Sequence, residues 1–278
     1  MQITGHTELI AHLGYPTHAF KAPMIYNPWF EPAGINAVVV PMGCKPELFP
    51  ALLPSLFGLT NIRGALITMP HKVSVVDLLD EVTPTVKVAG ACNAVKRAAD
   101  GRLVGDMFDG EGFVRGLKRK GLQLRGASAL VVGSGGVGSA IVASLAGAGV
   151  THLRLFDVNA SAAQALADRM ALHYPQVQVE SGINDPAGMD LAVNATPLGM
   201  RAGDPLPMDM GRVCKKTFVG EVVMQAETTA FLAAAQARGC QVQVGTDMLF
   251  EQIPAYLEFF GYPTTSAERL RSLARLAY

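Results

Sequence analysis

A glycine-rich loop between an apolar run and a helical segment is the first feature of this 278-residue chain with the pattern of a ligand site. Gly133, Gly135 and Gly138 form G-x-G-x-x-G directly after the apolar residues 129–132. In such a loop the first glycine allows a tight turn, the second lets backbone approach a pyrophosphate, and the third lets helix pack on strand. Because the N-terminus of a helix favours anions, the pattern predicts a dinucleotide site. The expected contacts are Gly133, Ser134, Gly135, Gly136, Val137 and Gly138.

An acidic residue closes the next expected strand. Asp157 lies 19 positions after Gly138 (157 − 138), where a carboxylate binds the ribose hydroxyls of an adenosine. It would repel a 2′-phosphate, and residues 158–160 offer no arginine to neutralise one. The pattern therefore favours NAD over NADP, with NADP left possible. A plainer interpretation also stays open, in which Asp157 only caps the helix that begins at Ser161.

Two polar clusters precede this loop. In one, Thr68 ends an expected strand, Pro70 stops it, and Lys72 opens a helix; in the other, residues 105–110 lead into a helix near 112–120. Taken alone, Lys72 fits a solvated lysine at a helix start better than a catalytic one. We expect the neighbouring His71 on the surface.

These residues need a framework of alternating strands and helices. Short apolar runs alternate with helical patterns along almost the whole length, which is typical of an α/β protein with parallel strands. In the first part we expect strands at 8–13, 36–41, 65–68, 93–98 and 102–105, with a hairpin turn at Asp100-Gly101, and helices at 22–30, 46–56 and 73–80. In the second part we expect strands at 129–132, 152–157, 176–179, 191–194, 218–222 and 241–244, and helices at 137–148, 161–173, 229–238, 248–260 and 266–277.

The polar clusters resemble, in order, motifs of the shikimate dehydrogenase family. Residues 64–72, 89–94 and 105–110 are similar to the family's G-x-N-V-T-x-P-x-K, A-G-A-x-N-T and G-D-N-T-D-G stretches. The resemblance continues through residues 133–138, 194–200 and 248–252, and so covers nearly the whole chain.

The resemblance implies hydride transfer between a nicotinamide and a ring C–OH of a shikimate- or quinate-like substrate, as in aromatic amino acid biosynthesis or quinate metabolism. The family's Lys and second Asp fall on Lys72 and Asp109, which are thereby implied as the acid–base pair. The implied substrate contacts are Thr68, Asn93 and Gln252. The further implied cofactor contacts are Asn194, Ala195, Thr196, Gly245 and Met248.

The resemblance also implies an architecture. We expect an N-terminal α/β substrate domain at 1–105 and a Rossmann NAD(P)-binding domain at 106–245. Helices at 246–278 would return to the substrate domain, which explains how Gln252 reaches the substrate.

The chain departs from the family at the end of the substrate that carries the carboxylate. The family holds that group with two serines in an S-x-S-P pattern; if Pro23 matches its proline, Phe20 and Ala22 occupy the serine positions. Three other polar positions of the family correspond here to Leu66, Phe108 and Met224. Burying a carboxylate without hydrogen-bond partners costs about several kcal/mol. We therefore expect an altered substrate, with Phe20, Ala22 and Met224 at its binding site.

Two alternatives stay open. In the first, the protein is a genuine shikimate or quinate dehydrogenase whose carboxylate site has shifted, for example to Thr17, His18 or Lys21. In the second, it is a dinucleotide-binding sensor without turnover. Retention of Lys72 and Asp109 together argues against the sensor, which needs neither.

Composition excludes several classes of protein. The 23 Lys+Arg balance the 23 Asp+Glu, and 50% of residues are hydrophobic. Disorder needs low hydrophobicity with high net charge, and a protein that tracks nucleic-acid phosphates needs a basic excess. The uncharged stretch between Arg125 and His152 is long enough to cross a bilayer, but it is rich in glycine and serine and contains the cofactor loop.

The remaining expectations concern location and partners. No basic stretch precedes an apolar run at the N-terminus, so we expect no signal peptide. The four cysteines form no C-x-x-C pair and are expected to be reduced thiols. His6, His12 and His18 recur at a spacing that shares no helix face, so we expect no metal site. We expect a cytoplasmic monomer or homodimer with a small-molecule substrate and neither a nucleic-acid nor a membrane partner.

Overall fold

The structure is a computed structural model that describes residues 2–224 and 228–276. Its contacts divide the chain into two units. Unit 1 comprises Met1–Val86, Gly90–Phe108 and Ile253–Tyr278, and unit 2 comprises Lys87–Ala89 and Asp109–Gln252. Each unit is built of strands and helices around one sheet, so the predicted α/β class is confirmed.

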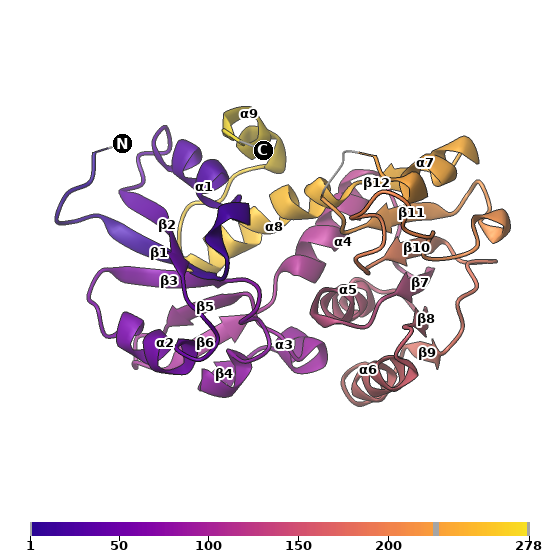
Figure 1. Cartoon of the computed structure of the whole chain (residues 1–278), viewed down its shortest axis with the longest axis horizontal. Helices are drawn as coiled ribbons and strands as arrows, with labels where there is room; N and C mark the ends of the chain where they lie inside the picture. Colours follow the sequence, from indigo (N-terminus) through magenta and orange to yellow (C-terminus); the bar gives the residue numbers. More distant parts are fainter. Residues whose placement is uncertain (1, 225–227, 277–278) are drawn as a thin grey trace. The chain divides into compact units, whose positions relative to one another are not determined.

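Unit 1 contains a six-stranded sheet in the order β2-β1-β3-β5-β6-β4 (Figure 1). Its strands are β1 (Glu8–Gly14), β2 (Ala37–Gly43), β3 (Ile62–Ile67), β4 (Glu81–Val82), β5 (Ala94–Arg97) and β6 (Leu103–Asp106). β1 runs parallel to both β2 and β3, and its residues 10–14 are all buried, as expected of a central parallel strand. β5 is antiparallel to β3 and β6, so the sheet is mixed, and the predicted hairpin at Asp100-Gly101 is present.

The helices of unit 1 come from both ends of the chain. They are α1 (Pro23–Phe30), α2 (Phe49–Phe57), the first half of α3 (Pro84–Ala89), the second half of α8 (Gly245–Phe260) and α9 (Ala267–Leu273). α1 packs on β2, and α9 packs on α1. The ring of Phe260 lies where Gly64 of β3 has no side chain. The C-terminal helices therefore return to the N-terminal unit, as the resemblance implied.

One expected helix is wrong, and one strand and one α-helix were missed. Residues 73–80 form turns and a short 3-10 helix (Val76–Leu78), so Lys72 lies in a turn rather than at a helix start. The β-branched residues in this stretch explain the difference, because they lose side-chain freedom in a helix. The missed elements are β4 and α3. The sequence does carry the caps of α3: Thr83 accepts a hydrogen bond from the Val86 N–H, and Gly90 ends the helix at φ +62°.

Unit 2 has a second six-stranded sheet, in which every strand is parallel, with the order β12-β11-β10-β7-β8-β9. Its strands are β7 (Ser128–Val132), β8 (His152–Phe156), β9 (Gln178–Ser181), β10 (Leu191–Asn194), β11 (Phe218–Glu221) and β12 (Val242–Gln243). Its helices include α4 (Asp109–Arg119), α5 (Gly136–Gly147), α6 (Ala160–His173) and α7 (Ala230–Ala237). Read from β9, this is the 3-2-1-4-5-6 strand order of the Rossmann fold. Dinucleotides bind in that fold where the order reverses, which here lies between β7 and β10.

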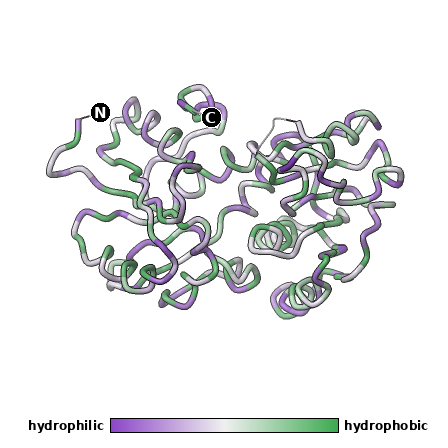
Figure 2. The backbone as a smooth tube through the Cα atoms, viewed as in Figure 1, coloured by the Kyte–Doolittle hydropathy of each residue, from purple (hydrophilic) through white to green (hydrophobic). Residues whose placement is uncertain are grey.

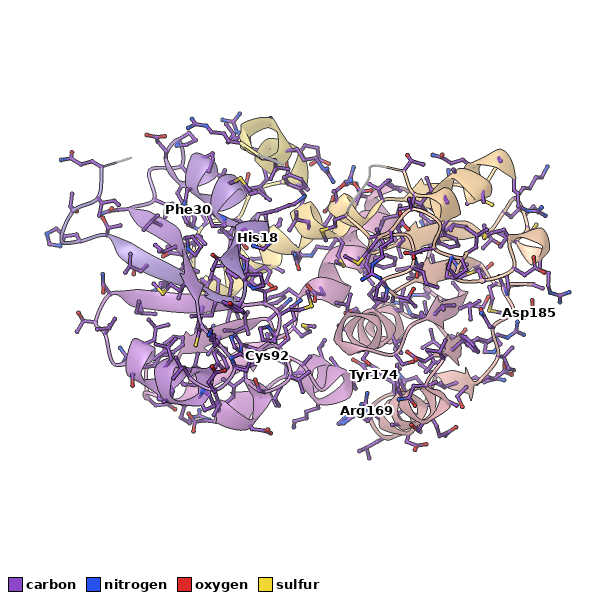
Figure 3. The ribbon with its side chains drawn as sticks, viewed as in Figure 1. His18, Phe30, Cys92, Arg169, Tyr174 and Asp185 are labelled. Carbon is purple, nitrogen blue, oxygen red and sulfur yellow. The ribbon has the colours of Figure 1, made fainter. Side chains whose placement is uncertain are left out.

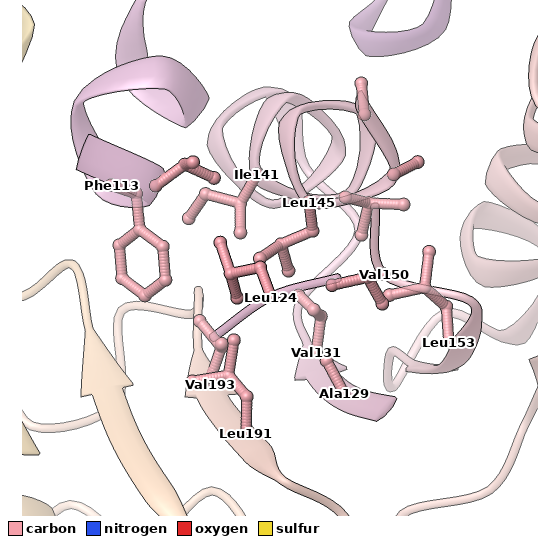
Figure 4. Close-up of a cluster of buried hydrophobic side chains, with 14 of the residues drawn as sticks. Phe113, Leu124, Ala129, Val131, Ile141, Leu145, Val150, Leu153, Leu191 and Val193 are labelled. Atoms are coloured by element: carbon pink, nitrogen blue, oxygen red, sulfur yellow. The ribbon is translucent and has the colours of Figure 1, made fainter. Parts of the chain in front are cut away.

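The core of unit 2 fixes the start of the cofactor loop. Figure 4 shows Phe113 of α4, Ile141 and Leu145 of α5, and Val131 and Val193 of the sheet within one buried cluster.

β7 and α5 account for the uncharged stretch, whose tube is mainly green and white in Figure 2. Across residues 2–224 and 228–276, no helix is long and apolar enough to span a membrane.

Candidate active site

The predicted cofactor loop joins β7 to α5. The Gly133 N–H donates to the Phe156 carbonyl at 2.8 Å, which holds the loop against the end of β8. α5 begins at Gly136 after an extended Gly135, so the unpaired N–H groups of its first turn face the loop.

Each of the three loop positions requires glycine for a different physical reason. Gly133 has φ +108°, and a Cβ there would lie 2.7 Å from the Ala195 carbonyl oxygen. A Cβ on Gly138 would collide with the Gly133 carbonyl oxygen, so this glycine permits the close packing of helix on loop. Nothing lies within 4 Å of the Cβ position of Gly135. The open space beside a helix N-terminus fits the pyrophosphate of a dinucleotide, and the residues present therefore fit that cofactor.

Asp157 follows β8 and organises the loop. One of its carboxylate oxygens accepts the Ser134 N–H at 2.7 Å, and the other accepts the Asn159 N–H at 2.8 Å. The cap of α6 is Asn159, whose side chain accepts from the Ala162 N–H, so the plainer interpretation of Asp157 as that cap is wrong. Val158 is 96% exposed and brings no positive charge to this place.

A second loop follows β10, on the other side of the switch point. The Ala195 N–H donates to the Val132 carbonyl at 2.8 Å, which joins this loop to the end of β7. The Asn194 side chain accepts from both the backbone N–H and the hydroxyl of Thr196. It also hydrogen-bonds Glu221, a fully buried carboxyl at the end of β11 whose pKa burial raises to about 7.

The remaining expected cofactor residues lie at the start of α8. A Cβ on Gly245 would collide with the Val223 carbonyl oxygen, so the helix starts directly against the end of the β11 segment. Met248 is buried in the core of unit 2. Met224, expected at the substrate, is half-buried and packs against that same core. Among the expected site residues in unit 2, Gly133, Ser134, Asp157, Asn194 and Thr196 thus lie together around the ends of β7, β8 and β10.

The expected substrate residues of unit 1 lie at the ends of β1, β3 and β6. Thr68 follows β3, and its N–H donates to the Leu13 carbonyl at 2.9 Å. Asn93 is 1% exposed; its side-chain oxygen accepts the Phe108 N–H at 2.9 Å, and its carbonyl accepts the Ile67 N–H at 2.8 Å. The chain segments that carry Thr68 and Asn93 are therefore held side by side.

Lys72 lies on the turn after Thr68. Its carbonyl accepts the Cys92 N–H at 2.7 Å, which fixes the turn to the segment before Asn93. His71 is buried rather than on the surface: its ring stacks on Phe49 at 4.0 Å, and its Nε2 lies 2.8 Å from the Cys44 carbonyl. Aromatic stacking thus anchors the turn from one side and Cys92 from the other.

Cys92 (Figure 3) is an inert thiol at this place. It is fully buried, and its Sγ donates to the Ala94 carbonyl at 3.1 Å. Burial raises its pKa to about 12, so it does not form a thiolate at neutral pH. Cys44, Cys92, Cys214 and Cys240 are all free, in agreement with the predicted reduced thiols.

Asp109 and Gln252 belong to unit 2. Asp109 is the first residue of α4 and is 4% exposed. Gln252 lies on α8 against Gly112 of α4, where a Cβ would come within 2.6 Å of the glutamine side chain. Its buried Oε1 has no hydrogen-bond partner within the described ranges. An unsatisfied buried oxygen costs about 1–3 kcal/mol, which fits a residue whose partner is a ligand.

The apolar residues of unit 1 that replace polar positions of the family have different surroundings. Phe108 packs its ring edge-on against Tyr256 and Phe259 of α8, so its side chain serves the packing of that helix. Ala22 precedes α1, whose first turn it leaves without a side-chain cap. Phe20 lies at the end of β1, where its Cζ would be 2.9 Å from a Cβ on Gly14. The same Gly14 position is crowded by the methyl group of Thr68, so Phe20 adjoins an expected substrate residue.

One polar residue of this region was missed from the sequence. His12, considered only as a metal ligand, is 8% exposed and stacks on Phe20 at 4.1 Å. His6 and His18 are exposed elsewhere, and no group of three metal-binding side chains occurs in the part of the chain that the structure describes. The apolar residues around His12 in β1 indicate a strand buried on both faces, and so a buried histidine, but not its partners.

Comparisons with known proteins agree with this arrangement. A family model described as "Shikimate dehydrogenase substrate binding domain" matches residues 13–95, and one described as "ThiF family" matches residues 114–178. The chain is 36% identical over 255 residues to the shikimate dehydrogenase (NADP(+)) of Rubrobacter xylanophilus, covering 90% of this chain and 89% of that protein.

Two solved structures are similar over nearly the whole length. The quinate dehydrogenase from Corynebacterium glutamicum in complex with NAD is 31% identical, with a TM-score of 0.85 and coverage of 96% of this chain and 98% of that one. The ligand-free 5-ketofructose reductase of a Gluconobacter species is 26% identical, with a TM-score of 0.89 and coverage of 97% and 98%.

Proposed function

The chain belongs to the shikimate dehydrogenase family, and we propose that it is an NAD-preferring dehydrogenase acting on a ring C–OH of a cyclic substrate that differs from shikimate at the carboxylate end. The proposal is supported by the retention of the family's polar residues at Lys72, Asp109, Thr68, Asn93 and Gln252. Its substrate part rests on matching Pro23 to the family's proline, which puts Phe20 and Ala22 at the two serine positions. The reaction is CH–OH + NAD⁺ → C=O + NADH + H⁺. NAD supplies the hydride acceptor when it is bound.

The residues of this chain do the proton chemistry. Lys72 takes up the hydroxyl proton as hydride leaves the carbon, and Asp109 stabilises the charge that the lysine gains. Backbone bonds at both ends of its turn fix the position of Lys72. Asp109 is buried at the N-terminus of α4, where the helix dipole favours its negative charge.

The substrate end is proposed to be less polar than in shikimate. At Phe20 an aromatic ring stands where the family has a serine hydroxyl, and at Ala22 a methyl group does. A site built to hydrogen-bond a group discriminates by orders of magnitude against molecules that lack this group. A site that has lost the donors no longer favours molecules that carry the group. A reductase named for 5-ketofructose, a substrate without a carboxylate, is among the similar structures. An ordinary shikimate or quinate dehydrogenase is the second candidate, favoured by the names of the relatives from Rubrobacter and Corynebacterium.

NAD preference rests on Asp157 and Val158. The carboxylate is half-buried beside the loop, and the exposed valine that follows gives no positive charge for a 2′-phosphate. Relatives use both cofactors: the Rubrobacter protein is named for NADP, and the Corynebacterium structure contains NAD.

A panel of cyclic substrates tests the proposal. Shikimate, quinate, cyclic polyols and apolar cyclic alcohols are offered with NAD⁺ while the absorbance of reduced nicotinamide is followed. We expect turnover of at least one member and its loss in Lys72→Ala, with NAD binding unchanged by calorimetry. Turnover that survives in Lys72→Ala would remove the proposed base, and NAD binding without turnover of any cyclic hydroxyl compound would favour the sensor.

A further inference from the structure

His12 occupies a defined place at the carboxyl end of β1. In the parallel sheet it pairs in register with Pro41 of β2 and Leu66 of β3. Side chains at paired positions of neighbouring strands point to the same face. His12 therefore shares a face with Leu66, the position where the family has a polar asparagine.

The imidazole of His12 is fixed by ring stacking, but its hydrogen bonding is incomplete. Its ring stacks on Phe20 with centroids 4.1 Å apart and 28° between the planes. The buried Nδ1 finds no hydrogen-bond partner among residues 2–224 and 228–276. Leaving such a nitrogen unpaired costs about 1–3 kcal/mol, so a purely structural role favours an aliphatic residue at this position of a buried strand.

The surroundings keep the ring neutral. Burial, and then the positive charge of Lys72, lower the pKa of His12 to about 4. A neutral imidazole offers one donor and one acceptor, which matches a hydroxyl group. It brings no charge to balance a carboxylate.

From this geometry we propose that His12 is a specificity-determining residue that hydrogen-bonds a non-reacting hydroxyl of the substrate ring. Leu66 on β3 offers no polar group, and His12 on the adjacent strand β1 supplies one on the same face, while Phe20 fixes the plane of the imidazole. The ligand class is a polyhydroxylated ring rather than a ring recognised through its acid group. This inference rests on the proposed function, since it concerns the same substrate.

Kinetics with matched analogues test the hydrogen bond. Quinate and analogues lacking one non-reacting ring hydroxyl at a time are compared on wild type, His12→Leu, His12→Asn and the control His152→Leu from β8. His12→Leu should lose at least tenfold in kcat/KM on quinate, and one deoxy analogue should show less than a twofold difference between variant and wild type. His12→Asn, which keeps a polar atom near the Nδ1 position, should recover part of the loss. An equal loss on every analogue, or a loss on quinate no larger than in His152→Leu, would overturn the proposal.

A binding measurement separates this inference from the reaction. The imidazole ¹⁵N signals of His12, assigned by their absence in His12→Asn, are followed while quinate, shikimate or myo-inositol is added with NAD⁺ present. A shift of these signals without turnover supports the His12 contact and refutes the proposed reaction. Turnover with unmoved His12 signals refutes the contact and leaves the reaction standing. Unmoved signals with all three compounds and no turnover refute both.

Discussion

Replacing Asp157 by asparagine should convert cofactor preference. In the structure its two carboxylate oxygens accept the N–H groups of Ser134 and Asn159 at 2.7 and 2.8 Å. The carboxylate therefore stands beside the loop with its charge fixed, where the adenosine ribose of a Rossmann dinucleotide binds.

The size of the effect follows from Coulomb's law. Two unit charges about 4 Å apart repel by about 1 kcal/mol in water and about 4 kcal/mol at an effective dielectric of about 20. Asp157 is half-buried, so about 2 kcal/mol of repulsion towards a 2′-phosphate is expected, or about 30-fold in affinity. Asparagine removes this repulsion and weakens the bonds to the ribose hydroxyls of NAD by about 1 kcal/mol. The ratio of kcat/KM for NAD⁺ to that for NADP⁺ should fall about 100-fold.

The assay compares initial rates with NAD⁺ and NADP⁺ at one fixed substrate concentration. Asp190→Asn is the matched control, because Asp190 also accepts a backbone N–H, from Ser128 at 2.9 Å, but at the opposite end of β7. Both variants should lose similar stability, whereas only Asp157→Asn should change the cofactor ratio. A wild type that prefers NADP, or a ratio that moves equally in both variants, would refute the reasoning.

Three further predictions concern the loop, the substrate end and pH. Gly138→Ala should cost about 1–3 kcal/mol of stability through overpacking, whereas Gly135→Ala should fold normally and weaken NAD binding. Thermal melts of both variants with and without NAD distinguish these effects, and equal melting temperatures would contradict them. Phe20→Ser combined with Ala22→Ser should raise kcat/KM for shikimate at least about tenfold, since each hydroxyl adds a charge-assisted bond worth about 1.5–3 kcal/mol; unchanged kinetics would count against the assignment of these positions. Glu221 has a raised pKa, so its neutral form stabilises the fold fully below pH about 4.5 and this contribution, up to about 3 kcal/mol, is lost as pH rises through about 7. The free energy of unfolding of Glu221→Gln, measured in urea, should therefore rise relative to that of the wild type between pH 5 and 8. The same pH dependence in both proteins would disprove the buried acid.

The Rossmann unit was predictable because its signals are local. The glycines of the loop, the acidic residue after β8 and the alternation of short apolar runs with helical patterns are all readable within about 30 residues. The strand predicted at residues 191–194 has the same ends as β10. The hairpin at Asp100-Gly101 followed from its turn residues.

The errors arise where tertiary packing outweighs local pattern. The stretch after Lys72 has helical periodicity, but His71 is pulled inward onto Phe49, and the chain forms a turn. The sequence marks Phe108 only as an apolar residue at a polar position of the family, while the structure gives it a packing role against Tyr256. His12 was missed because a single histidine in an apolar strand shows its stacking partner and its unpaired nitrogen only once the strands are in register.

The central claim is that the family's hydride chemistry is retained while the grip on the shikimate carboxylate is lost. It is tested most directly by kcat/KM of the wild-type protein for shikimate with NAD⁺, measured beside carboxylate-free cyclic polyols. We expect a value for shikimate below about 10⁴ M⁻¹s⁻¹, at the bottom of the usual enzyme range, with another ring compound used more efficiently. A value of about 10⁶ M⁻¹s⁻¹ or above for shikimate would contradict it.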